Sequence, residues 1–396
     1  MNPNGYESIV DNYKQITNKF KIYIYDFHPP EFKSIKEFVH HTINDKGFDW
    51  AETYKSWLYF MYFVMNSPMY TEDPNIADLF FVPQYEFVYR WKNFKRDYIE
   101  PLEKAINSEH FKKSLKRNHL IAYSSDHTVL GDFRIPNHLK DVIRERFFRI
   151  SYSGRLYKFG KFHNNTVSDT MFDFNPAHEV VVPPGIPLNY YIRKPIKRYH
   201  DNDIMYIGTL SPINKLVERR DALKYMSQNF TIKDTDDSYF GIHCAGAGIW
   251  TARFYNYLTL GIIPICFSDG VLLPFETFFN YRSFSLKILS QTCDHNKQEF
   301  VETIKSACAA TRDFTKDSAP ENTVATRIYR MQDNVDEVAD WFNWRSEKPF
   351  KNPFTLTIIE LYNKVNNCFK ETENPVAKEE FYDFNESDLP LYKHIE

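Results

Sequence analysis

The sequence lacks the features that mark several common classes of protein. Its 49 Lys and Arg residues do not outnumber its 52 Asp and Glu residues, so the basic excess that drives nucleic-acid binding is missing. The five cysteines are odd in number and widely spaced, which fits neither a zinc site nor a disulfide framework. We therefore expect no nucleic-acid partner, and free thiols at Cys244, Cys266, Cys293, Cys308 and Cys368.

The pattern of a membrane-spanning or targeting segment is not expected in this sequence either. The longest apolar run, residues 57–65, is too short to cross a bilayer. The N-terminus lacks the charged and then apolar arrangement of a signal peptide. We expect a cytoplasmic protein with no membrane span. Glycosylation requires a secretory context, so little weight falls on the Asn-x-Ser/Thr matches at Asn164, Asn229 and Asn385.

The chain is long enough to bury two hydrophobic cores. Its 396 residues exceed what one core usually serves, which predicts two domains of roughly 150 to 200 residues each. Hydrophobic residues at 43% and charged residues at 26% are typical of soluble globular proteins. The aromatic content of 17% is high, and exposed aromatic rings often stack on sugars, although most such rings fill cores. It is a weak indication of carbohydrate binding.

Strand-like and helix-like segments alternate along the N-terminal half. Short β-branched and aromatic runs predict strands, and longer apolar stripes predict helices. The predicted strands are residues 21–27, 77–83, 119–123 and 180–182, and the predicted helices are residues 54–66 and 94–115. Such alternation predicts an α/β fold with a mostly parallel sheet.

A second alternating series follows a proline-rich stretch. Residues 183–203 are polar and proline-bearing, which makes them the best linker candidate. We expect an N-terminal domain at 1–190, a C-terminal domain at 191–370 and an acidic tail at 371–396. In the second domain we predict strands at 204–207, 239–243 and 262–267, and helices at 216–229, 250–260, 299–310, 328–342 and 353–369.

A glycine pair between a strand and a helix is the most informative feature. Gly246 and Gly248 follow the strand at 239–243, and Arg253 falls in the first turn of the next helix. Glycine lets the backbone approach a phosphate, while the helix N-terminus and a guanidinium both favour the negative charge of a departing diphosphate. Alternatively, the glycines only permit the turn, and Arg253 pairs with a carboxylate on the surface.

A carboxylate follows the next strand. Glu276 ends the Leu-Pro-Phe-Glu segment at 273–276, where open α/β sheets bind ligands, and it can accept both hydroxyls of a ribose. The alternative is structural, because a glutamate after proline in the first turn of a helix is stabilised by the helix dipole without any ligand.

Together these segments resemble the exostosin-like glycosyltransferase family. The order and spacing of its glycine turn, Ser-x-Arg, Gly-Cys-Ile-Pro and Leu-Pro-Phe are matched by Gly246, Thr251-Ala252-Arg253, Gly261-Ile262-Ile263-Pro264 and Leu273-Pro274-Phe275. Further similar segments are KIYIYDFHPPEF, DPNIADLFFVP and HEVVVPPGIP, so the resemblance covers roughly residues 21–290. The sequence departs from the family at Thr251, where serine is usual, at Ile262, where cysteine is usual, and at Tyr257, where a small residue is usual.

The resemblance implies a GT-B fold, in which two Rossmann-like domains face a central cleft. It implies inverting, metal-independent transfer of a sugar from a nucleotide diphosphate donor, such as a UDP-sugar, to a glycan hydroxyl, with no cofactor required. The N-terminal domain would then hold the acceptor, and the C-terminal domain would hold the nucleotide sugar.

The same resemblance assigns roles to individual residues. His127, oriented by Asp126, is the implied catalytic base, and Glu86 competes for that role. Gly208 and Arg220, or the neighbouring Arg219, are implied to line the phosphate pocket with Gly246, Gly248, Thr251, Arg253 and Glu276. Arginines in such a helix are otherwise solvated surface residues.

Two other interpretations stay open. A metal-dependent GT-A transferase would hold a divalent ion with an Asp-x-Asp motif, and matches occur at residues 201–203 and 234–236, both in polar, turn-like contexts. A non-catalytic sugar- or nucleotide-binding protein of the same fold would keep the ligand site without turnover.

Overall fold

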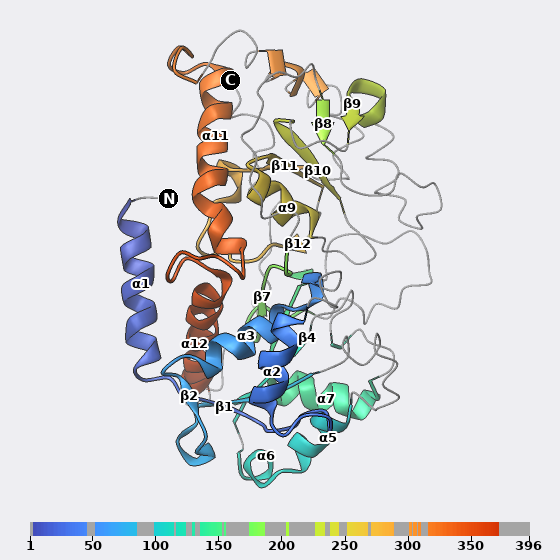
Figure 1. The fold of residues 1–396 in the computed structure, drawn as a ribbon, viewed down its shortest axis with the longest axis vertical. Helices are drawn as coiled ribbons and strands as arrows, with labels where there is room; N and C mark the ends of the chain where they lie inside the picture. Colours follow the sequence, from blue (N-terminus) through green and yellow to red (C-terminus); the bar gives the residue numbers. More distant parts are fainter. Residues whose placement is uncertain are drawn as a thin grey trace.

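The computed structural model contains two parallel β-sheets at the two ends of its long axis (Figure 1). The residues that the structure describes are 3–45, 52–84, 99–114, 116–123, 129–130, 135–152, 154–155, 174–186, 203–205, 226–233, 238–244, 252–267, 271–288, 301–302, 304–306, 308–309 and 316–371.

The first sheet has six strands, and every neighbouring pair is parallel. In spatial order they are β2 (Tyr70–Thr71), β1 (Ile22–Ile24), β3 (Leu79–Val82), β4 (His119–Tyr123), β5 (Phe147–Ser151) and β7 (Glu179–Val181). Side chains alternate between two cores: in β3, Leu79 and Phe81 belong to one hydrophobic core, and Phe80 and Val82 to the other. Burial on both faces is typical of a parallel sheet covered by helices.

Helices cover both faces of the first sheet. One core takes apolar side chains from α1 (Pro3–Thr17), α2 (Ile35–Asn44) and α3 (Ser56–Met65). The other takes them from α5 (Glu100–Asn107), α6 (Glu109–Lys113) and α7 (Asn137–Arg146). A short 3₁₀ turn, η2 (Pro74–Ile76), precedes β3. The sheet therefore lies between two layers of helices.

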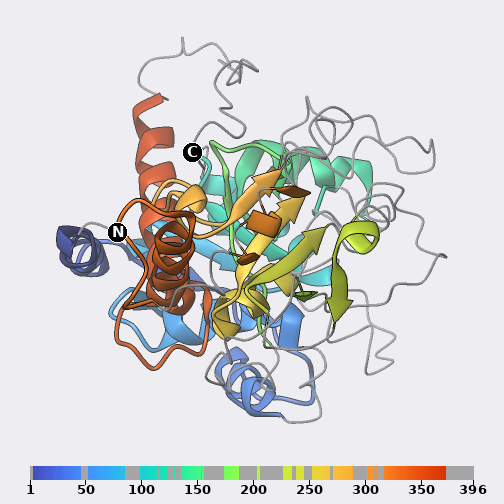
Figure 2. The same ribbon diagram turned by 90° about the horizontal axis from the view of Figure 1, so that it is seen from above.

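The second sheet has five parallel strands in the order β13-β11-β10-β8-β9, with β9 at one edge (Figure 2). Their bounds are β8 (Asp203–Met205), β9 (Thr231–Lys233), β10 (Phe240–Cys244), β11 (Ile263–Phe267) and β13 (Leu286–Ile288). Helix α9 (Arg253–Leu260) packs against β10 and β11, and α11 (Val324–Val338) packs against α9 and β11. Short 3₁₀ turns η5 (Tyr281–Ser283) and η6 (Ala339–Phe342) lie beside these elements.

Each sheet begins with the strand order 2-1-3-4-5 in chain order, the flavodoxin-like version of a doubly wound sheet. The winding direction reverses between β1 and β3 in the first sheet and between β8 and β10 in the second. At such a switch point the loops that leave the carboxyl ends of adjacent strands diverge and leave a crevice, where doubly wound proteins bind ligands. In the second sheet the two strands at the switch point end at Met205 and Cys244.

The end of the chain returns to the first sheet. Helix α12 (Pro353–Glu371) packs against α1, α3 and β7, and both views show α1 and α12 side by side (Figures 1 and 2). The segment before it is anchored by Arg345, which donates hydrogen bonds of 2.9 and 3.0 Å to the fully buried carboxylate of Glu52. Trp344 donates from Nε1 to the carbonyl of Pro183 at 2.7 Å. Contacts therefore join segments that are far apart in sequence.

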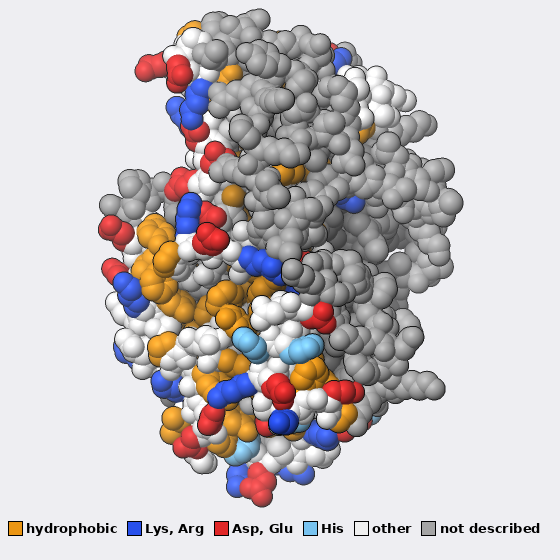
Figure 3. Space-filling model, in the orientation of Figure 1, with side chains coloured by type: hydrophobic (Ala, Val, Ile, Leu, Met, Phe, Trp, Pro, Cys, Tyr) orange, Lys and Arg blue, Asp and Glu red, His pale blue; other side chains and the backbone are white. Residues whose placement is uncertain are grey.

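The described surface mixes charges of both signs. On the face drawn in Figure 3, the Lys and Arg side chains lie among Asp and Glu side chains rather than in one block. Over the part of the chain that the structure describes, no helix is both long enough and apolar enough to cross a membrane.

The α/β class and the mostly parallel sheets predicted from the sequence are confirmed, and the predicted strands coincide with β1, β3, β4, β7, β8, β10 and β11. One prediction is wrong: the apolar stripe at 94–115 does not form a single helix, because α5 ends at Asn107 and the Ser108 hydroxyl caps α6 by accepting from the Phe111 N–H at 3.2 Å. The linker and the tail lie largely outside the described residues, so the domain bounds stay predictions. Cys266 and Cys308 are buried thiols in no disulfide.

Candidate functional site

Two of the predicted site residues are described, Arg253 and Glu276. The candidates for the catalytic base and most of the phosphate-binding residues lie outside the described residues: Glu86, Asp126, His127, Gly208, Arg219, Arg220, Gly246, Gly248 and Thr251. The two Asp-x-Asp matches also lie outside them, apart from the backbone of Asp203 at the start of β8.

Helix α9, which carries Arg253, is held against β10 by the packing of Tyr257 on Gly241. The Tyr257 ring lies over Gly241, and its hydroxyl donates to the Ile242 carbonyl at 2.9 Å. At its other end the helix stops at Gly261 in the left-handed conformation, φ 74°, where the N–H of Ile262 bonds to the Tyr257 carbonyl at 2.9 Å. This Schellman motif ends the helix, and the chain then continues into β11.

The start of α9 has the properties of an anion-binding site. Ala252 occupies the N-cap position and supplies no side-chain hydrogen bond to the helix. The N–H groups of a first turn have no partner inside their own helix, and together with the helix dipole they favour a negatively charged ligand. Arg253 is the first residue of the helix and is half-buried, not projected fully into solvent.

A buried histidine lies beside this first turn. His243, near the carboxyl end of β10, is 3% exposed, and its ring meets the Phe254 ring edge-on with centroids 5.3 Å apart. Burial, and then the positive charge of Arg253, lowers the pKa of His243 from its ordinary 6.5 to about 3. The imidazole is therefore neutral at pH 7, and its Nδ1 has no hydrogen-bond partner among the residues that the structure describes.

His243 was not among the residues predicted from the sequence. The apolar run around it predicted a strand, and a lone histidine in a strand is most often a core residue. Its strand position, with Gly241 two residues earlier on the same face and covered by Tyr257, is the signal that places it under α9. That signal depends on knowing which face α9 covers.

A second buried histidine provides a contrast. His119 in β4 is fully buried, and its pKa is also lowered to about 3, chiefly by burial. Both of its nitrogens are bonded: Nδ1 lies 2.9 Å from the Asn118 side-chain oxygen, and Nε2 lies 3.0 Å from the Tyr25 hydroxyl. His119 is a satisfied core residue, whereas His243 keeps an unpartnered atom at a helix start.

Glu276 lies in a rigid turn. One of its carboxylate oxygens accepts a 3.1 Å hydrogen bond from the N–H of Leu273, and the Tyr281 hydroxyl donates to the Pro274 carbonyl at 2.5 Å. Phe275 between them is buried in the left-handed region, φ 62°, which a non-glycine residue adopts only when its surroundings hold it there. The structural alternative, in which Glu276 lies in the first turn of a helix, does not apply, because residues 274–278 form turns.

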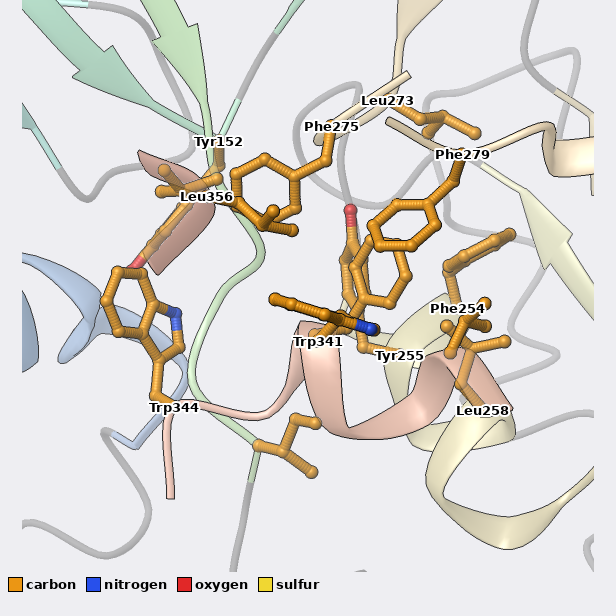
Figure 4. Close-up of a cluster of buried hydrophobic side chains, with 14 of the residues drawn as sticks. Tyr152, Phe254, Tyr255, Leu258, Leu273, Phe275, Phe279, Trp341, Trp344 and Leu356 are labelled. Atoms are coloured by element: carbon orange, nitrogen blue, oxygen red, sulfur yellow. The ribbon is translucent and has the colours of Figure 1, made fainter. Parts of the chain in front are cut away.

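Aromatic packing holds this turn against α9 and η6. Phe275 and Phe279 lie 6.0 and 5.5 Å from Phe342 between ring centroids, and Figure 4 draws them beside Tyr255 of α9 and Trp341 of η6. Burial raises the pKa of Tyr255 well above its ordinary range, with a further contribution from the negative charge of Glu276. The carboxylate of Glu276 and the start of α9 thus belong to one packed unit.

The two halves of the chain meet next to this turn. Strand β12 (Val271–Leu272), directly before Leu273, pairs antiparallel with β6 (Gly154–Arg155) from the first half. The pairing brings the end of β5 to the Glu276 turn, since β6 follows β5 closely in the chain.

Among the described residues, no group of three or more His, Cys, Asp or Glu is placed to hold a metal ion. In comparisons with known proteins, no family model matches the chain, and no curated protein matches it.

Proposed function

We propose that this chain is a glycosyltransferase of the GT-B type, which moves a sugar from a nucleoside diphosphate donor to an acceptor hydroxyl without a metal ion. The observation that carries the proposal is the position of Arg253. It begins the helix that follows β10, one of the two strands at the switch point of the second sheet. It also lies beside the buried His243, whose Nδ1 has no partner in the described part of the chain.

A diphosphate matches the donor groups at the start of α9. The N–H groups of a helix start and a guanidinium are all donors, and a guanidinium can bond two phosphate oxygens at once. Ala252 supplies no side-chain cap, so a ligand anion would be the acceptor for the N–H groups of the first turn. The sequence resemblance described above supports the same ligand.

In the proposed reaction the acceptor oxygen bonds to the anomeric carbon of the sugar as the bond from that carbon to the diphosphate breaks. The electron pair leaves with the diphosphate, and the acceptor proton passes to a base on the first half, for which Asp126 with His127, or Glu86, remain the candidates. Arg253 would offset the negative charge that grows on the leaving group, which lowers the barrier more than it strengthens ground-state binding.

The Glu276 turn is the proposed ribose site. Its carboxylate lies in a packed turn at the end of β12, so its direction is fixed before a ligand arrives. A preorganised acceptor loses little entropy on binding two ribose hydroxyls. The β6–β12 pair next to it supports an acceptor approaching from the first half.

The test is release of nucleoside diphosphate from a panel of UDP- and GDP-sugars, with and without glycan acceptors, in buffer that contains a chelator. We expect release from at least one donor, an increase with acceptor, and a loss of about 100-fold in turnover in Arg253→Ala. Arg282→Ala removes an exposed arginine from the same half and should retain the activity.

The other outcomes separate the alternatives. Activity that requires manganese would favour the metal-dependent class. Binding of a nucleotide sugar with no release from any donor would favour a non-catalytic binding protein. Full activity in Arg253→Ala would contradict the proposed role of Arg253 and the start of α9 in binding the diphosphate.

A further inference from the structure

The fold leaves the hydrogen-bonding capacity of one buried imidazole incomplete. Within the described residues, Nδ1 of His243 has no hydrogen-bond partner, although the side chain is only 3% exposed. An unpartnered buried polar atom costs about 1 to 3 kcal/mol, so native proteins usually pair such atoms with protein, water or a ligand. His119 has both nitrogens bonded, which shows that the same residue type can be fully satisfied in this chain.

The position of this nitrogen favours a ligand over a packing defect. His243 lies in β10, a switch-point strand, opposite Cys266 of β11. Its ring contacts Phe254, the second residue of α9, and Arg253 is close enough to lower its pKa. The imidazole and the guanidinium therefore both lie near the start of α9, where the first-turn N–H groups are further donors.

A neutral imidazole has a specific advantage here. A second cation beside Arg253 would be repelled by it, whereas an uncharged ring can donate an N–H without that penalty. Arg253 then supplies the charge, and the histidine supplies a directed hydrogen bond.

We propose that His243 is a second phosphate-binding residue of this site, donating from Nδ1 to a diphosphate oxygen of the nucleotide held by Arg253 and the start of α9. The inference rests on the proposed function and deepens it. Two donors on different elements can bond oxygens of two different phosphates, and a nucleoside monophosphate offers only one phosphate group. His243 therefore sets the preference for nucleoside diphosphates over monophosphates.

The experiment is titration calorimetry with UDP, UMP, GDP and GMP on the full chain, on Arg253→Ala and on three histidine variants. His243→Phe keeps a ring against Phe254 but removes both nitrogens, and His243→Asn places an amide near the position of Nδ1. His119→Phe is the matched control, because it replaces a buried neutral histidine outside the site.

We expect His243→Phe to weaken binding of the preferred diphosphate about tenfold, with little change for the corresponding monophosphate. His243→Asn should restore most of the preference. His119→Phe should lower stability without changing the ratio of the diphosphate and monophosphate affinities. If the role of His243 were purely structural, the His243 variants would behave in the same way.

Each contrary outcome has a separate meaning. If Arg253→Ala weakens diphosphate binding but a folded His243→Phe does not, the role of His243 is overturned and the proposed function stands. If the unmodified protein binds no nucleoside diphosphate, the proposed function itself is overturned. If His243→Phe does not fold, His243→Gln, whose amide reaches the position of Nε2, replaces it; equal diphosphate affinity in the Asn and Gln variants would overturn the role of Nδ1.

Discussion

The ring of Tyr257 occupies the space that a side chain at Gly241 would fill. A Cβ atom at Gly241 would lie 2.7 Å from Cδ1 and Cε1 of that ring, far inside contact distance. The Tyr257 hydroxyl also bonds the Ile242 carbonyl, so the glycine and the tyrosine together set the height of α9 above β10. Arg253 begins this helix, and its position follows from the pair.

Gly241→Ala tests this relationship. The added methyl must push the Tyr257 ring and α9 away from the sheet, and overpacking of this kind costs about 1 to 3 kcal/mol in the free energy of unfolding. Urea denaturation measures the change. The same substitution should cost less in a Tyr257→Ala background, because the clash is then absent, whereas equal costs in the two backgrounds would show that the ring is not the obstacle.

Substitutions at Glu276 separate its structural and ligand-binding roles. Gln keeps an oxygen that can accept from the Leu273 N–H, so Glu276→Gln should fold with near-normal stability but bind the donor more weakly. Glu276→Ala also loses the turn hydrogen bond, at a cost of about 1 kcal/mol. Thermal melting and donor titration measure the two effects. Unchanged donor affinity in Glu276→Gln would show that the ribose assignment is wrong.

Acid should destabilise the protein through its buried histidines. The pKa values of His243 and His119 fall from 6.5 to about 3 on folding, so below pH 6.5 the unfolded chain binds protons that the folded chain does not. Stability is therefore lost as the pH falls from 6.5 towards 3, by about 1.4 kcal/mol per pH unit for each group.

His243→Phe removes one of these groups. Its free energy of unfolding, followed by urea denaturation between pH 6.5 and 5, should fall less steeply than that of the unmodified protein by the contribution of one histidine. Parallel curves would mean that His243 is protonated in the folded state or is not buried.

The Glu52–Arg345 pair should be important for stability. Glu52 is fully buried and faces two cations, Arg345 and Lys55, whose Nζ lies 3.1 Å away. Glu52→Gln would leave both cations uncompensated, which costs about 3 to 5 kcal/mol for a buried pair. Arg345→Met should cost less, because Lys55 still neutralises the carboxylate. A lower denaturation midpoint for Glu52→Gln than for Arg345→Met would support this expectation, and the reverse order would contradict it.

The sequence predicted the parallel sheets because their strands are short apolar runs between helical stripes, a pattern that depends on local spacing. It placed Arg253 at a helix start for the same reason. It could not predict the return of α12 to the first sheet or the pairing of β6 with β12, because two-residue strands and long-range packing leave no local pattern. Nor could it predict the environment of His243, which depends on the face of β10 that α9 covers.

The break at Ser108 illustrates a further limit. The apolar stripe continues through it, but a serine hydroxyl that accepts from the backbone N–H of Phe111 competes with continued helix. Periodicity records the buried face and not such a local hydrogen bond.

The most direct test of the account is a crystal structure with uridine diphosphate or guanosine diphosphate bound. We expect the diphosphate at the N-terminus of α9, with the Arg253 guanidinium on its oxygens and Nδ1 of His243 within hydrogen-bond distance. A bound nucleotide whose phosphates lie away from Arg253, or a complex in which the start of α9 contacts no anion at saturating nucleotide, would contradict the central claim.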